Sequence, residues 1–168
     1  FFTVLLFSSI SNFCFQNIET NSPIKTTEKM EKFQIEKLSA KGQTAYQNLL
    51  NAERFEDSFI GYAGSYSVLV KSLNDLSKEK KADEAFKALL NEAKIAGQLY
   101  ALNGLYYTDQ EFFKKAVENY RNDLTLVNRM SGCLISSEKV RDIIESKSPV
   151  VAKLLPNETM EDFWKRNK

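Results

Sequence analysis

The sequence predicts a mainly α-helical protein with one compact helical domain, an irregular bundle or an α-α superhelix-like array, that leaves room for a minor β-hairpin. Two observations favour this class. Apolar residues recur at helical spacing in several segments, and short polar stretches separate these segments. The length, 168 residues, suits a single domain after a short N-terminal stretch is set aside. We expect the domain to span residues 26–168.

The first residues differ from the rest of the chain. Residues 1–10 (FFTVLLFSSI) are apolar and uncharged, and small serines follow before the composition turns polar. This pattern is typical of a secretory signal peptide, so residues 1–15 are predicted to be a signal peptide or a membrane anchor. Ten apolar residues are too few to cross a bilayer; a buried N-terminal helix is the remaining alternative. Residues 16–25, with Pro23, are predicted to be a flexible tether.

The two cysteines lead to separate hypotheses. Cys14 directly follows the apolar stretch, where bacterial lipoproteins carry their acylated cysteine, although residues 11–13 depart from the usual small-residue pattern. Cys14 is therefore a possible lipidation site. Cys133 lies between Gly132 and Leu134 in an apolar run and is expected to pack as a small hydrophobic residue. A disulfide between Cys14 and Cys133 in an oxidising compartment is the alternative.

Three helices are expected before residue 77. The first begins near Thr26, the second follows Gly42, and the third is capped by Ser65 or Ser67. Their apolar positions at helical spacing are Met30, Phe33 and Leu38 in the first, Tyr46, Leu49 and Leu50 in the second, and Val68, Leu69, Leu73 and Leu76 in the third. Residues 77–81 form the clearest turn of the chain.

The middle of the chain predicts three more helices in close succession, over residues 83–93, 95–107 and 109–121. The second of them is apolar on nearly every side, so it should be the buried centre of the core. Residues 108–111 (TDQE) match a capping box, which predicts that Thr108 caps the third of these helices and that Glu111 supports it.

Residues 83–121, with such short connections, are similar to the α-α layers of HEAT-type and armadillo-type repeat proteins. The similarity covers about 40 residues, contains no diagnostic motif, and has no second copy elsewhere in the chain. It implies stacked helix pairs, and in those repeat families such a fold usually serves protein binding.

The last third is less regular. Residues 124–130 and 133–135 predict a small hairpin or irregular packed segments. Ser136 or Ser137 is expected to cap a short helix that turns Val140, Ile143 and Ile144 inward. Residues 148–149 (Ser-Pro) predict the start of another helix, which ends at Pro156. Asn157 is expected to cap a last helix.

An aromatic and glycine-rich stretch interrupts the helical pattern at residues 53–67. It predicts a structured loop, or a short strand near residues 59–62. Its rings and glycines form a candidate interaction loop, with the alternative that they cover one end of the helical core. The residues of this loop are Phe55, Phe59, Gly61, Tyr62, Gly64 and Tyr66.

Composition argues against several functional classes. The chain contains no histidine, which removes the commonest general base and zinc ligand. Lys plus Arg (23) and Asp plus Glu (22) nearly cancel and are interspersed, so nucleic acid is not an expected partner. No catalytic, metal or cofactor residues are assigned, and no cofactor is expected. Whether the protein is an enzyme stays open, with the balance toward a non-enzyme.

The leading hypothesis is an exported or envelope-associated helical binding or scaffold module with a protein partner. Its location would be periplasmic, outer-envelope or secreted, with possible membrane attachment through the N-terminus. Two alternatives remain. One is a protein that binds a small apolar ligand between its helices; the other is an enzyme that uses carboxylates or lysine without histidine.

Overall fold

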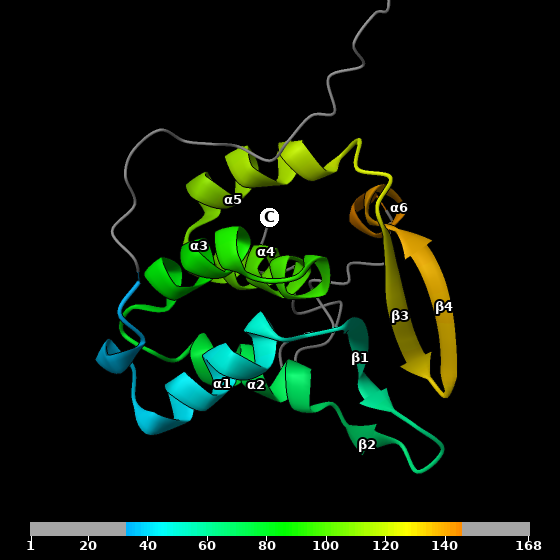
Figure 1. Cartoon of the computed structure of the whole chain (residues 1–168), viewed down its shortest axis with the longest axis horizontal. Coiled ribbons are helices and arrows are strands. Elements are labelled where there is room, and N and C mark those ends of the chain that lie inside the picture. The colour runs from blue at the N-terminus through cyan, green and yellow to red at the C-terminus, as the bar shows by residue number, and fades with distance from the viewer. Residues whose placement is uncertain (1–32, 146–168) are drawn as a thin grey trace, which may run out of the picture.

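The protein has an α/β fold with a four-stranded mixed sheet (Figure 1). The computed structural model describes residues 33–145. Helices make up 58% of the described residues and strands 19%, so the prediction of a mainly α-helical domain is wrong. The error has a physical cause: the two central strands pair residues that lie more than seventy positions apart, such as Arg54 with Asn128, and no local pattern reveals that pairing.

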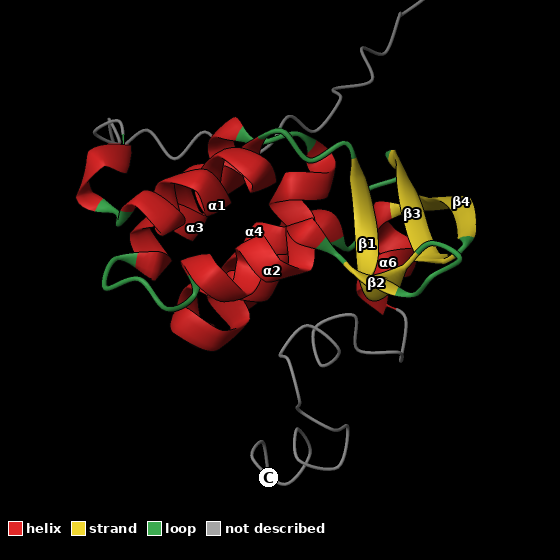
Figure 2. Ribbon diagram, turned by 90° about the horizontal axis from the view of Figure 1, so that it is seen from below, coloured by secondary structure: helices red, strands yellow, loops and turns green. Residues whose placement is uncertain are grey.

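The elements follow one another in two groups. A helical layer is interrupted by one hairpin, and a second hairpin and a short helix close the described part (Figure 2). The elements are η1 (Ile35–Lys37), α1 (Ala40–Leu50), β1 (Arg54–Ile60), β2 (Ser65–Tyr66), α2 (Val68–Leu76), α3 (Ala82–Glu92), α4 (Ile95–Thr108), α5 (Gln110–Val117), η2 (Glu118–Tyr120), β3 (Leu126–Gly132), β4 (Leu134–Lys139) and α6 (Val140–Glu145).

The sheet has the strand order β2-β1-β3-β4. Each outer strand pairs antiparallel with its neighbour in sequence, whereas the central strands β1 and β3 run parallel. The connection between these parallel strands contains helices α2 to α5, because a parallel pair needs a long crossover. The register of β1 and β3 shifts between Glu56 and Ile60, which marks a bulge near the end of β1.

Helix α4 is the centre of the core, as its apolar sequence predicts. Nine of its residues are buried, among them Tyr100 and Leu105 at 0% exposure. Two glycines let neighbouring segments approach α4 closely. A Cβ atom at Gly97 would collide with the carbonyl oxygen of Leu49, and one at Gly104 would collide with the ring of Phe86.

Serine or aspartate side chains cap the starts of α1, α2 and α5. The Ser67 hydroxyl accepts from the amides of Leu69 and Val70, which confirms Ser67, rather than Ser65, as the cap of α2. Helix α1 begins at Ala40, before Gly42, because Ser39 caps it.

The predicted capping box at residues 108–111 is wrong in detail. Asp109 caps α5 by accepting from the amide of Phe112 at 3.0 Å. The Thr108 hydroxyl instead donates to the carbonyl of Gly104, inside the preceding helix. Asp109 also pairs with Lys87 at 2.7 Å, so tertiary charge pairing adds to the choice of cap.

The stretch left open between hairpin and coil is a regular hairpin, β3–β4, with a tight turn at Gly132 and Cys133. Cys133 is exposed and free, so the prediction that it packs in the core is wrong. Ser136 and Ser137 lie within β4 and do not cap α6, although α6 does bury Val140 and Ile143 as expected.

Several predictions fall outside residues 33–145. These are the signal peptide or anchor at residues 1–15, lipidation of Cys14, the tether at residues 16–25, the start of the first predicted helix, and the two helices expected after residue 147. Within the described part, no helix is long and apolar enough to cross a membrane.

Candidate interaction site at two hairpin tips

Two hairpin tips lie side by side at one end of the sheet (Figure 1). The tip of β1–β2 is the turn at residues 61–64, and the tip of β3–β4 is the turn at residues 132–133. The amide of Gly61 donates a 2.9 Å hydrogen bond to the carbonyl of Gly132, which ties the two turns together. We call this the joined tips. A surface formed there has contributions from segments seventy residues apart in sequence.

Backbone conformation explains the glycines at the joined tips. Gly61, Gly64 and Gly132 have φ values of +74°, +62° and +57°, in the left-handed region that residues with a Cβ rarely adopt. A second bond, from the amide of Gly64 to the carbonyl of Gly61 at 3.1 Å, closes the first turn. The joined tips therefore have a defined backbone geometry.

The joined tips present large apolar side chains to solvent. Tyr62 is 100% exposed, and Phe59 is 62% exposed. Phe59 lies opposite Tyr66 across the hairpin, and their ring centroids are 5.5 Å apart in an edge-to-face contact. From the other tip, Leu134 is 76% exposed. Clusters of exposed apolar side chains on a folded surface are typical of interaction sites.

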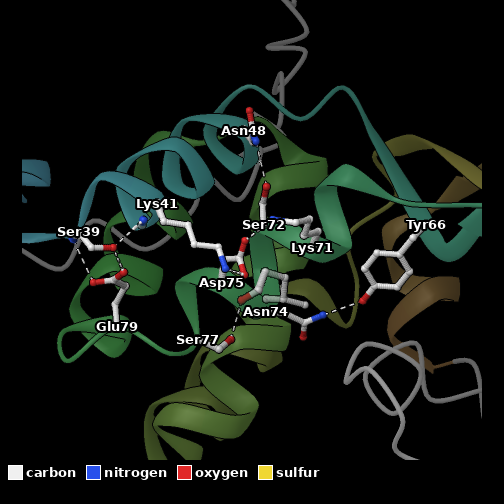
Figure 3. A network of polar contacts seen from close by, with 12 residues as sticks. Ser39, Lys41, Asn48, Tyr66, Lys71, Ser72, Asn74, Asp75, Ser77 and Glu79 are labelled. Carbon is white, nitrogen blue, oxygen red and sulfur yellow. Dashed lines mark hydrogen bonds and ion pairs between the residues drawn. The ribbon is translucent and has the colours of Figure 1, made fainter.

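Tyr66 links the aromatic group to the helical layer. Its hydroxyl accepts a 2.9 Å hydrogen bond from the side-chain amide of Asn74 on α2 (Figure 3). Burial raises the pKa of Tyr66; the Asn74 bond opposes this rise, and the nearby Asp75 carboxylate adds to it. Tyr66 therefore stays neutral at physiological pH. Its bond to Asn74 fixes the position of the ring that contacts Phe59.

Not every predicted member of the interaction loop belongs to this surface. Phe55 is fully buried and packs on Tyr100, with ring centroids 4.7 Å apart. It packs against α4 inside the core, which is closer to the alternative that these rings cover the helical core. The other five residues, Phe59, Gly61, Tyr62, Gly64 and Tyr66, lie together at the turn.

A buried polar group anchors β1 at the root of this hairpin. Glu56 is only 4% exposed, and its carboxylate accepts from the Ser67 hydroxyl at 2.6 Å and from Arg54 Nε at 2.6 Å. The Tyr100 hydroxyl accepts from the amide of Glu56 at 2.8 Å. Burial raises the pKa of Tyr100, and the Glu56 charge adds to the rise. All these groups have partners within the protein, which indicates a structural role.

A second polar group joins three strands near the tips. Arg129 on β3 lies 3.4 Å from Asp57 on β1 and 3.3 Å from Glu138 on β4. Asp57 also accepts from the Ser131 hydroxyl at 2.6 Å. The guanidinium thus bridges carboxylates on the two neighbouring strands and links β1, β3 and β4 through side chains.

The remaining ionisable groups do not assemble a reaction centre in the described part of the chain. Carboxylates that could serve in acid–base chemistry have partners within the protein: Glu53 pairs with Lys94, and Asp109 caps α5. Glu111 pairs with Lys114 on the same helix. Among residues 33–145, no group of His, Cys, Asp and Glu side chains has the arrangement of a metal site.

Sequence reasoning identified the first tip and left the second open between a hairpin and irregular packed segments. Cys133 was expected to pack in the core, whereas Cys133, Leu134 and Ile135 are all exposed at or beside the second tip. The signal that identifies them is the Gly-Cys pair between two apolar runs, which favours a two-residue hairpin turn.

Comparison of the chain with protein-family models, curated proteins and solved structures finds no match.

Proposed function

We propose that this protein is a non-enzymatic binding module that recognises a protein partner through the joined tips. The observation that carries the proposal is the concentration of exposed aromatic side chains, with Tyr62 fully exposed, on a turn whose backbone is fixed by hydrogen bonds. Tyrosine is enriched at positions that dominate binding energy, since it gives a large contact area at small entropic cost.

The rigid anchoring of the tips supports this proposal. Arg129 connects the strands below the turns, Glu56 connects β1 to Ser67 at the start of α2, and Tyr66 connects the turn to α2. A surface that is already ordered loses less conformational entropy on binding than a mobile loop does. Such a surface suits a partner with a shallow apolar groove.

Its experimental test uses site-specific photo-crosslinking in the native cell. A photoreactive phenylalanine analogue replaces Tyr62, and a control replaces Lys80, an exposed residue in the connection between α2 and α3. We expect one defined crosslinked protein from position 62 and none from position 80. Equal products at both positions, or none at position 62, would refute a binding role for the tips.

Export to the cell envelope or beyond is the second part of the proposal. It rests on the apolar stretch at residues 1–10 and on Cys14 behind it. The intact mass of the protein from its own cells tests it. Cleavage before Cys14 with added acyl chains identifies a lipoprotein, and cleavage without them identifies a secreted module. A chain that retains these residues contradicts cleavage.

A further inference from the structure

Strand β4 ends the sheet on one side, and its far edge faces solvent. The strand order β2-β1-β3-β4 places β3 on one side of β4, and no other strand of residues 33–145 lies on the other side. Figures 1 and 2 both show β4 at the rim of the described part. All residues of β4 are exposed except Glu138, which is half-buried. The strand contains neither a proline nor a bulge, two devices that commonly block pairing at an edge.

The hydrogen bonds of the hairpin determine which peptide groups of β4 point outward. The amide of Val140 donates to the carbonyl of Thr125 at 3.0 Å, and these two residues continue the register of β3 and β4. Hydrogen-bonded pairs alternate with non-hydrogen-bonded pairs along an antiparallel ladder. The backbone N–H and C=O groups of Ile135, Ser137 and Lys139 therefore point away from β3, and β4 offers donors and acceptors at its outer edge.

The spacing of these groups fits a second copy of β4. A two-fold axis beside Ser137 pairs the strands antiparallel, with Ser137 opposite itself and Ile135 opposite Lys139 of the other copy. All three outward residues then form hydrogen-bonded pairs, which gives about six main-chain hydrogen bonds. A shift by two residues in either direction places one outward residue opposite the turn or α6. The centred register is therefore the one that uses the whole edge.

The side chains across this axis are compatible. Lys139 lies opposite Ile135 of the other copy, where its aliphatic stem covers a side chain that is 60% exposed. Glu138 lies opposite Ser136, and these two residues make a 2.7 Å hydrogen bond within one chain. The two Glu138 carboxylates lie diagonally across the axis, and each has Arg129 as a partner at 3.3 Å. Like charges do not lie directly opposite each other, which is the arrangement that destabilises a strand pair.

We infer that two copies of this chain pair through the outer edges of β4 and form a two-fold dimer with one continuous sheet. The same residues serve both copies in such an interface. A contact of one short strand should bury less than the about 800 Å² per partner of a stable interface, so the dimer should dissociate on dilution. Because the paired strands run in opposite directions, the joined tips of the two copies lie at opposite ends of this sheet. The inference does not depend on a partner at the tips.

Sedimentation velocity of the full-length chain tests whether the dimer forms. From about 5 to about 500 µM, the chain should show a reversible equilibrium between monomer and dimer. The substitution Ser137→Pro removes an outward donor and no hydrogen bond to β3, so the monomer should keep its fold. This variant should stay monomeric with the circular dichroism spectrum of the parent chain. The control Ser137→Thr keeps the amide and should still dimerise.

Cysteine crosslinking tests the register. Cys14 and Cys133 are replaced by serine, and Ser137→Cys or Ser136→Cys is added. Across the axis, the Cα atoms of position 137 are about 5.5 Å apart, within reach of a disulfide, whereas those of position 136 are about 8 Å apart. Mild oxidation should give at least about fivefold more linked dimer from position 137 than from position 136.

Three results would overturn the inference. One is a parent chain that is monomeric at the highest concentration, and another is a dimer that survives Ser137→Pro. The third is an equal yield of linked dimer from the two cysteine positions. If Ser137→Pro does not fold, the cysteine pair decides whether the edges of β4 meet.

Discussion

The hydroxyl of Ser67 donates a 2.6 Å hydrogen bond to the buried carboxylate of Glu56. The same oxygen accepts from the amides of Leu69 and Val70, at 3.1 and 3.2 Å, and so caps α2. One hydroxyl thereby uses its donor and both acceptor positions. It fixes the start of α2 against the root of the first hairpin, so the helical layer and the sheet are joined at this point.

Replacement of Ser67 by alanine should therefore cost more than the loss of an ordinary cap. Loss of the cap should cost about 1 kcal/mol of stability. Loss of one hydrogen-bond partner of the buried Glu56 carboxylate should cost about 1–3 kcal/mol more. Urea denaturation should show a loss of about 2–4 kcal/mol. Ser65→Ala, at an exposed position two residues away, is the matched control and should change stability by less than about 0.5 kcal/mol. Equal effects of the two substitutions would contradict the double role of Ser67.

Replacement of Gly104 by alanine should destabilise the protein, although alanine normally favours a helix by about 1 kcal/mol. The new Cβ collides with the ring of the fully buried Phe86. Overpacking of this kind costs about 1–3 kcal/mol. Thermal unfolding should show a lower Tm for Gly104→Ala, whereas Gly42→Ala meets only the flexible side chain of Glu79 and should be nearly neutral. A rise in Tm for Gly104→Ala would contradict the close packing of α3 on α4.

Replacement of Arg129 by methionine should weaken the sheet. It leaves the carboxylates of Asp57 and Glu138 facing each other without the guanidinium between them. Because the Arg129 side chain is only 17% exposed, we expect a loss of about 1–3 kcal/mol. The control is Arg141→Met, which breaks a pair with Asp142 at the surface and should cost below about 0.5 kcal/mol. Hydrogen exchange of the β3 amides should accelerate in the first variant alone; unchanged exchange would argue against this role.

Stability should fall in acid in part because of Asp75. Burial by itself would raise the pKa of this carboxyl, but hydrogen bonds from Lys41 and Lys71 outweigh burial and lower the pKa below 3.8 (Figure 3). The folded protein therefore binds the proton more weakly than the unfolded chain does. The resulting stabilisation is complete above about pH 5 and is lost as the pH falls toward 2.

The variant Asp75→Asn tests this pH dependence. It should be less stable than the parent protein at pH 7, and the difference should shrink as the pH is lowered to 3. Urea midpoints at pH 7, 5 and 3 measure it. A stability difference that stays constant from pH 7 to pH 3 would show that Asp75 does not contribute to the loss of stability in acid.

Helices α1 to α5 were predictable from the sequence because their stability depends on local spacing. The first predicted helix was wrong over its described part, where only the short η1 forms. Phe86, Leu89 and Ala93 fall on one face of α3 or at its end, and all are buried as the pattern indicates. Helix α4, apolar on every side, is the core centre. Here the local pattern and the tertiary packing agree.

The sheet was not predictable in the same way. Strand β1 (RFEDSFI) buries Phe55 and the adjacent Glu56, so it lacks the alternation of a half-buried strand. Strand β4 (LISSEK) is exposed on both faces and also shows no alternation. The parallel pairing of β1 with β3 depends on long-range contacts, and a single sequence gives no local sign of them.

Only the first of the two tips that form the candidate site was predicted as an interaction site. The glycines and aromatic residues of the first turn were found, because such residues in one short segment indicate a structured turn. The second tip was not assigned to the site because the stretch was left open between a hairpin and packed segments, and because Cys133 was expected to pack as a small hydrophobic residue. The parallel pairing of β1 with β3, together with the bond between Gly61 and Gly132, brings the two tips together, and these contacts belong to tertiary structure.

The central claim, that the joined tips bind a protein partner, is tested most directly by affinity. The partner captured from position 62 would be titrated against the parent protein, against the double variant Phe59→Ser and Tyr62→Ser, and against the control Lys78→Ser and Lys80→Ser. Exposed aromatic anchors at an interface each contribute about 1–2 kcal/mol or more. The account predicts a Kd at least about tenfold higher for the first variant and an unchanged Kd for the control. An unchanged Kd for the aromatic variant, with its fold intact, would contradict it.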